Sequence, residues 1–137
     1  MIDIKQKVKV ALQGFLAQSG AEELVLLYSG GRDSTVLLEL LGSMKDSLSF
    51  KLRAIHVDHR LTDGSANQAK ECARVAKERH VELKVHRVVG KPSIGQSVEE
   101  WARNQRYNYV RRQVNSRCLV LTAHHSNDQV ETVIQRF

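Results

Sequence analysis

The sequence is poor in proline, cysteine and aromatic residues, and it has no long apolar run. Its 137 residues include one Pro and two Cys, and 5% are aromatic. The scarcity of proline argues against a low-complexity linker. The longest apolar stretches, such as residues 24–28, are far too short to cross a bilayer, and the charged N-terminus lacks the apolar core of a signal peptide. We therefore expect one globular domain without a membrane partner.

The two cysteines, Cys72 and Cys118, lie far apart in the sequence and form no CxxC pair. Their spacing fits neither a zinc site nor a disulfide framework. We expect two buried thiols in a reducing, cytoplasmic environment.

Positive charge is in excess, with 21 Lys and Arg against 15 Asp and Glu, a net charge of +6. Such a balance favours a polyanionic partner. Basic and aromatic residues are concentrated between positions 101 and 117, where guanidinium groups and aromatic rings would suit RNA phosphates and unstacked bases. The same residues would also fit a solvated helix face with aromatic core contacts. The members of this group are Trp101, Arg103, Arg106, Tyr107, Tyr109, Arg111, Arg112 and Arg117.

The hydrophobic pattern alternates between helical periods and short continuous apolar runs. This alternation predicts an α/β fold with a parallel sheet covered by helices on both faces. Ligands bind such sheets beyond the carboxyl ends of the strands. The expected strands are 24–28, 52–57, 83–89 and 118–123, and the expected helices are 3–18, one ending near Gly42, 65–79, 97–112 and a last one after residue 126.

The segment SGGRDS, residues 29–34, carries the strongest functional signal because it joins a buried strand to a helix. Gly30 and Gly31 allow the backbone to approach a ligand, and successive N–H groups at a helix N-terminus bind anions. The flanking Ser29, Ser34 and Thr35 add hydroxyl groups. The loop is neither a Walker A motif nor a dinucleotide-binding fingerprint. It therefore predicts a phosphate site of another type.

A carboxylate inside this loop, Asp33, would repel phosphates unless a cation lay between them. Mg²⁺ accepts carboxylate and phosphate oxygens together, although Asp33 could instead only cap the helix. Asp128 and Glu131 would lie on one face of the last helix, at the same sheet edge, and could join Asp33 around Mg²⁺. Stabilisation of the helix dipole is the alternative role for these two acids.

Histidines near these acids allow a second interpretation, a metal cluster of a hydrolase. A phosphate-binding loop would add nothing to such an enzyme, so this interpretation is disfavoured. The residues concerned are His56, Asp58, His59, His124, His125 and Asp128.

Four segments together resemble the tRNA(Ile)-lysidine synthetases: LYSGGRDSTVLLELL, AIHVDHRL, SVEEWARNQRY and LTAHHSNDQVET. They occur in that family's order over about residues 24–135. SGGxDS is shared with GMP, NAD and argininosuccinate synthetases and with tRNA thiolases, but the second and fourth segments narrow the match. The resemblance implies the Rossmann-like PP-loop fold of the adenine-nucleotide alpha-hydrolases.

The resemblance also implies a two-step ligase reaction that forms a C–N bond. ATP adenylates the carbonyl oxygen of the wobble cytosine of tRNA(Ile) and releases pyrophosphate, and the amine of L-lysine then expels AMP. By resemblance, residues 29–34, including Arg32, hold the phosphates with Mg²⁺, and the strand end at His56 and Val57 contacts adenine. Asp128 or Glu131 would accept the proton of lysine.

By the same resemblance, Arg103 and Arg106 would contact ATP or tRNA. Arg103 could instead pair with Glu99 on an exposed helix.

The sequence departs from the family in two respects. Asn127 replaces the first of two acids before the Gln of AHHxDDQ, and the chain stops inside the expected last helix. We therefore expect residues 1–137 to form a PP-loop catalytic domain truncated at its C-terminus. Val130, Val133, Ile134 and Phe137 would face a missing neighbour, and a homodimer is one arrangement that would cover them. Another SGGxDS enzyme, or a nucleotide-binding module without catalysis, remains an alternative.

Overall fold

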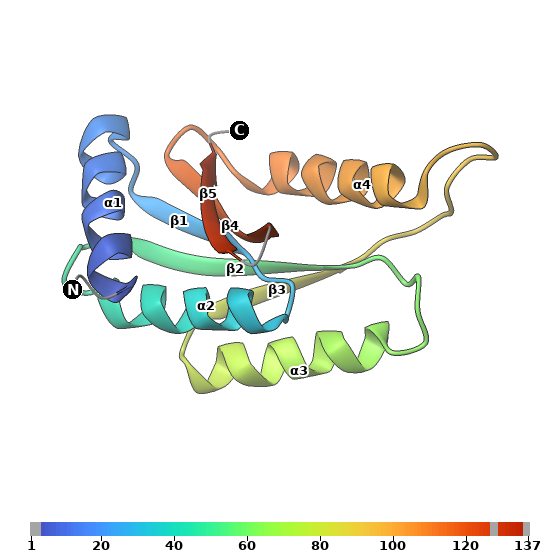
Figure 1. The fold of residues 1–137 in the computed structure, drawn as a ribbon, viewed down its shortest axis with the longest axis horizontal. Helices are drawn as coiled ribbons and strands as arrows, with labels where there is room; N and C mark the ends of the chain where they lie inside the picture. The colour runs from blue at the N-terminus through green and yellow to red at the C-terminus, as the bar shows by residue number, and fades with distance from the viewer. Residues whose placement is uncertain (1–3, 127–128, 136–137) are drawn as a thin grey trace.

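The computed structural model describes residues 4–126 and 129–135, with side chains described for residues 5–123. In these described residues four helices and five strands are present, and helix and strand alternate as far as β4, which β5 follows directly (Figure 1). The helices are α1 (Ile4–Ser19), α2 (Arg32–Met44), α3 (Ser65–Glu78) and α4 (Val98–Gln113), and the strands are β1 (Glu23–Leu27), β2 (Lys51–Asp58), β3 (Glu82–Arg87), β4 (Cys118–Ser126) and β5 (Gln129–Gln135).

The strands form one sheet in the order β3-β2-β1-β4-β5. Strands β1 to β4 run parallel, and β5 pairs antiparallel with β4. The chain steps from β1 outward to β2 and β3, and then returns to the other side of β1 as β4. The point where the direction of winding reverses therefore lies between β1 and β4, which is where ligands bind in sheets of this kind.

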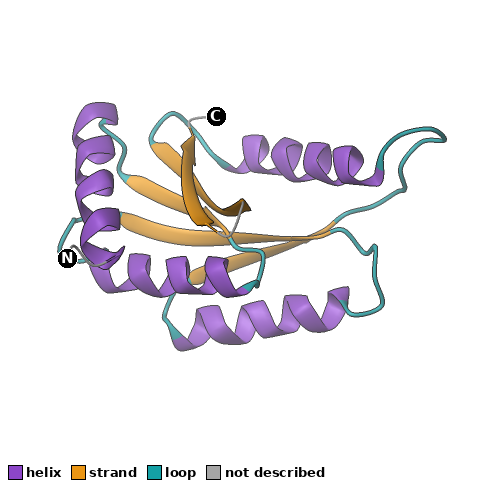
Figure 2. Cartoon of the chain, viewed as in Figure 1, coloured by secondary structure: helices purple, strands orange, loops and turns teal. Residues whose placement is uncertain are grey.

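Helices cover both faces of the sheet, as the sequence predicts (Figure 2). One core packs residues of α1, α2 and α3 against the sheet, including Leu12, Leu38 and Cys72. The other packs Tyr109 and Val110 of α4 against the opposite face. This division follows from right-handed crossovers, because the chain winds in opposite directions on the two sides of β1.

The apolar run of β1 explains its central position. Leu24, Val25 and Leu26 are fully buried, with alternate side chains entering the two cores. A strand covered on both faces needs apolar residues at every position, which is what this segment provides. The polar segment that follows β1 is thereby fixed at the carboxyl edge of the sheet, in the middle of the molecule.

The expected last helix is wrong, because residues 129–135 form strand β5. The segment QVETVIQ is rich in β-branched residues, and β4 offers it an open edge for pairing. Glu131 therefore lies in a strand, opposite His124, and the argument that placed Asp128 and Glu131 on one helical face does not hold. Asp128 itself lies outside the described residues.

Candidate functional site

The glycine turn, residues 29–34, leaves the carboxyl end of β1 and enters α2. Gly30 has a φ of +88°, a backbone conformation that only glycine adopts readily. Gly31 is the N-cap residue of α2 and has no side chain that could bond to the first helical turn. The N-cap position thus leaves the first N–H groups of α2 to other partners, and helix N-termini of this kind bind anions.

Hydroxyl groups within the turn hold its shape. The Ser29 N–H donates to Ser34 Oγ at 3.1 Å, and the Gly31 N–H donates to Ser29 Oγ at 3.2 Å. Thr35 Oγ1 donates to the Gly31 carbonyl at 2.9 Å and lies 3.0 Å from the Tyr28 hydroxyl. The sequence predicts the hydroxyl groups of Ser29, Ser34 and Thr35 as hydrogen-bond donors to phosphate. In the structure they make contacts that fix the backbone of the turn.

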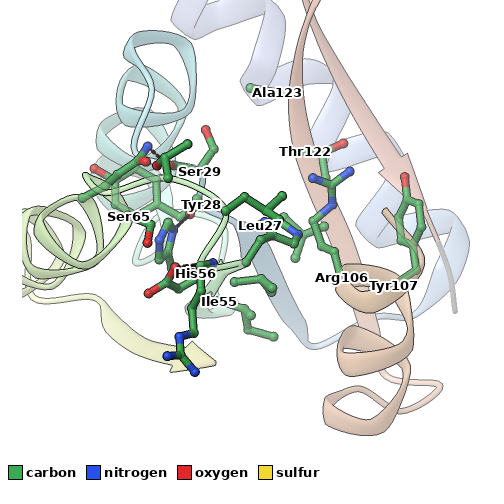
Figure 3. A pocket seen from close by; sticks show the side chains of 17 residues that line it. Leu27, Tyr28, Ser29, Ile55, His56, Ser65, Arg106, Tyr107, Thr122 and Ala123 are labelled. Atoms are coloured by element: carbon green, nitrogen blue, oxygen red, sulfur yellow. Dashed lines mark hydrogen bonds between the residues drawn. The ribbon is translucent and has the colours of Figure 1, made fainter. Parts of the chain in front are cut away.

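A cavity of about 420 Å³ opens beside the turn (Figure 3). Its volume is within the range of small-molecule sites. It is formed by the ends of β1, β2 and β4, the loop after β2, the start of α3 and the middle of α4. The lining residues are Leu27, Tyr28, Ser29, Ile55, His56, Val57, Asp58, His59, Arg60, Leu61, Thr62, Ser65, Gln68, Arg106, Tyr107, Thr122 and Ala123.

The predicted residues of strand β2 lie at the cavity. His56 is buried, and its Nδ1 donates to the Tyr28 carbonyl at 2.8 Å, because a carbonyl oxygen can only accept. Asp58 is also buried, and its carboxylate accepts a hydrogen bond from the Arg60 N–H at 2.9 Å. His56 and Val57 thus both line the cavity.

His59 connects the loop after β2 to α4. Its Nε2 donates to the Ala102 carbonyl at 3.0 Å. Burial lowers the pKa of His59 below its ordinary value, against the raising effect of that hydrogen bond, and the positive charge of Arg106 lowers it further. The imidazole is therefore neutral at physiological pH, and it acts here as a hydrogen-bond donor between two elements of the site.

The two candidate arginines of α4 have different positions. Arg106 lines the cavity, and in Figure 3 it reaches in from the side opposite Ser29 and Ser65. Arg103 is exposed and lies outside the cavity lining. Both guanidinium groups approach the Tyr107 ring, with Cζ 5.4 Å and 5.6 Å from its centroid. The alternative arrangement, an ion pair of Arg103 with Glu99, is not among the ion pairs of the described residues.

Asp33 lies in the first turn of α2 and is half-buried. A carboxylate beside a phosphate-binding backbone is a suitable magnesium ligand. Among residues whose side chains are described, no three His, Cys, Asp or Glu lie close enough together to hold a metal. The other two predicted carboxylates fall outside that set, since Asp128 is not described and only the backbone of Glu131 is.

Sequence reasoning missed Gln68 and Ser65 of α3, which line the cavity. One weak signal was available, because α3 follows β2 and must start at the same sheet edge where β2 ends.

The two cysteines are free and buried, as expected. In the described part of the chain, no helix is long and apolar enough to cross a membrane.

Comparison with known proteins supports the predicted resemblance. Curated proteins named tRNA(Ile)-lysidine synthase match this chain at 40% identity in Vibrio vulnificus strain YJ016, 39% in Blochmanniella pennsylvanica and 36% in Buchnera aphidicola from Acyrthosiphon pisum. These matches cover 81%, 83% and 88% of this chain, but only 26%, 24% and 27% of the relatives. The chain thus spans about a quarter of the length of the curated relatives it matches.

A family model described as the PP-loop domain matches residues 4–137, nearly the whole chain. The match includes the glycine turn, the strand ends around the cavity and helix α4. The chain belongs to the PP-loop domain family.

Proposed function

We propose that this chain is the ATP-using part of a ligase that joins lysine to the wobble cytidine of tRNA(Ile). The observation that carries the proposal is the juxtaposition of the glycine turn with the cavity at the reversal point between β1 and β4. The names of the curated relatives indicate lysidine in tRNA(Ile) as the product. In the proposed reaction the carbonyl oxygen of the cytosine attacks the α-phosphorus of ATP and displaces pyrophosphate. The lysine amine then attacks the carbon that bears this oxygen, loses a proton and expels AMP.

The turn and the cavity suit different parts of ATP. The turn offers the Gly30 N–H and the start of α2 to the phosphates, with Arg32 exposed beside them. The cavity has room for the nucleoside, and His56 and Val57 would contact adenine there. Because the two regions share Ser29, the phosphates and the nucleoside would meet at this residue.

The carboxylates would serve the metal and the proton transfer. Asp33 fits Mg²⁺ by its position in the first turn of α2, and we propose Asp128 and Glu131 as further ligands. When bound, Mg²⁺ neutralises negative charge on the phosphates and on departing pyrophosphate. Asp128 or Glu131 would also accept a proton from lysine, which must attack as a free amine.

The arginines of α4 would divide between the two larger substrates. Arg106 lines the cavity and would contact ATP or the adenylated base. Arg103 is exposed beside the Tyr107 ring, an arrangement of cation and aromatic plane that suits RNA.

We propose a cytoplasmic location, because ATP, lysine and tRNA meet there and free thiols such as the two in this chain persist there. A homodimer is our proposal for the oligomeric state, and light scattering would test it.

AMP formation tests the proposal directly. The purified chain would be incubated with ATP, Mg²⁺, lysine and a tRNA(Ile) transcript, with omission of one component at a time. We expect AMP to form only when RNA and lysine are both present. Nucleotide binding without AMP formation would instead make the chain a binding module, and AMP formation with a sulfur donor in place of lysine would indicate a thiolase.

The role of Asp33 is tested by Asp33→Asn, which keeps the shape of the side chain and removes its charge. We expect Mg²⁺ to strengthen ATP binding to the unmodified chain, and we expect the variant to lose that effect, about tenfold in Kd. Calorimetric titration with and without Mg²⁺ measures both values. Asp46→Asn, a change in an exposed residue beyond the end of α2, is the matched control.

A further inference from the structure

Two successive carbonyl groups before the glycine turn are held by side chains from other elements. The Tyr28 carbonyl accepts from His56 Nδ1 of β2, and the Ser29 carbonyl accepts from Gln68 Nε2 of α3, each at 2.8 Å. Gln68 lies in the first turn of α3, far from the turn in sequence. The orientation of the peptide groups that enter the turn is therefore set from outside it.

The bond from Gln68 has a geometric consequence for the next residue. In a trans peptide the carbonyl and the following N–H point in opposite directions. The chain has no cis peptide among its described residues, so the Gly30 N–H points away from Gln68. Within the described residues no hydrogen bond occupies this N–H. It is a donor fixed in direction and available to an anion.

Helix α3 also packs directly against the turn. A Cβ atom added at Gly30 would lie 2.7 Å from Cys72 Sγ and 3.3 Å from Gln68 Nε2. Cys72 is buried, and burial raises the pKa of its thiol to about 11, so this wall carries no charge. The turn thus has a close-fitting support behind Gly30, and it cannot move toward α3.

We propose that Gln68 is a positioning residue, which orients the Gly30 N–H toward the phosphates of the nucleotide. It acts through the Ser29 carbonyl. The inference rests on the proposed function for its ligand, since it presumes that the phosphates of ATP occupy the turn. It deepens that function by assigning part of the phosphate selectivity to a residue outside the SGGRDS segment.

The variant Gln68→Met tests this role, because methionine keeps the length and packing of the side chain and removes the donor. We expect the Kd for ATP to rise about three- to tenfold, the range of one lost hydrogen bond, and the Kd for adenosine to change less than twofold. Gln13→Met, an exposed mid-helix glutamine of α1, should change neither. An equal loss of adenosine affinity would overturn the inference, since Gln68 would then contact the nucleoside.

A measurement without ligand separates this inference from the proposed function. We expect the ¹⁵N order parameter of the Gly30 amide to fall from about 0.85 to below about 0.6 in Gln68→Met and in Gln68→Glu, which cannot donate at neutral pH. An unchanged Gly30 amide in both variants would overturn the inference. A chain that bound neither ATP nor adenosine would refute the proposed function, and the amide measurement would still decide whether Gln68 orients the turn.

Discussion

The two edges of the sheet use polar groups in opposite ways. Near the amino ends of the strands, polar side chains bond chiefly to one another: Glu23 accepts from Arg53 Nε at 2.8 Å and from Cys118 Sγ at 3.2 Å. At the carboxyl ends, His56 and Gln68 bond to backbone carbonyls, and the cavity lies beside them.

This difference separates stability from function. At the amino edge, charged and polar groups form hydrogen bonds with each other. Their removal should therefore lower the stability of the fold and leave ligand affinity unchanged. At the carboxyl edge the side chains fix the backbone, so N–H groups and the cavity wall remain available. Changes at each edge should therefore alter different measurements.

The largest effect is expected for Gly30→Ala at the carboxyl edge. Alanine would be strained at a φ of +88°, and its Cβ would collide with Cys72 Sγ. We expect a loss of about 1–3 kcal/mol in the free energy of unfolding and at least a tenfold rise in the Kd for ATP. Denaturant titration and calorimetry measure the two quantities.

Gly14→Ala is the control for that change. Gly14 lies in α1, and a Cβ there would meet no atom within 4 Å. Alanine is the better helix former, so this variant should gain up to about 1 kcal/mol and bind ATP normally. Normal ATP binding by Gly30→Ala as well would break the assignment of phosphate binding to the turn.

A smaller effect is expected for Glu23→Gln at the amino edge. The variant should lose about 1 kcal/mol of unfolding free energy, the net size of one typical hydrogen bond, because the amide oxygen of Gln can still accept from Arg53, and the Kd for ATP should not change. Burial is the largest single influence on Glu23 and opposes its ionisation. The hydrogen bonds from Arg53 and Cys118, with the positive charges of Arg53 and Lys51, together outweigh burial and lower the pKa of that carboxyl below 4.5. Its contribution is therefore present above pH 4.5 and is lost as the pH falls through the lowered pKa.

Acid titration of both proteins checks this point. The stability difference between the unmodified chain and Glu23→Gln should shrink below pH 4.5. A change in ATP affinity in the variant would contradict the separation between the two edges.

The smallest effect concerns His59 at the carboxyl edge. Burial lowers the pKa of His59 in the folded chain below the ordinary 6.5 of the unfolded chain. Between the lowered pKa and 6.5, the unfolded chain therefore binds a proton at His59 more readily than the folded chain does. Stability should therefore fall as the pH drops below about 6.5. Comparing unfolding at pH 7.5 and 5.5, we expect a weaker pH dependence in His59→Asn. An identical dependence in both proteins would exclude His59 as its source.

Sequence patterns predicted most of the fold because the buried runs are unambiguous. The run at residues 24–28 predicted a strand covered on both faces, and the structure confirms it as β1. The helix expected from residue 97 is present as α4, and Ser97 caps it by accepting from the Glu100 N–H at 3.4 Å. The prediction of a last helix was wrong because Asn127 and Asp128 resembled a helix start. The β-branched residues after them favoured pairing with β4 instead.

The site was predictable where it is continuous in sequence, as in the glycine turn and the end of β2. Gln68 was not predictable from the sequence. It lies 39 positions after Ser29, and only the packing of α3 against the glycine turn brings the two residues together. The positions of Arg103 and Arg106 also required the structure. They lie three residues apart on α4 and so share a face of the helix, yet only Arg106 lines the cavity.

The central place of β1 has a consequence for synthesis of the protein on the ribosome. Glu23 at the start of β1 is in register with Cys118 at the start of β4, 95 residues later. Since β1 is flanked by both β2 and β4, its second neighbour is synthesised 95 residues after β1 itself. The carboxyl edge of the sheet would therefore stay incomplete on the ribosome until β4 has emerged, and a ligand that needs both strands would bind only after that point.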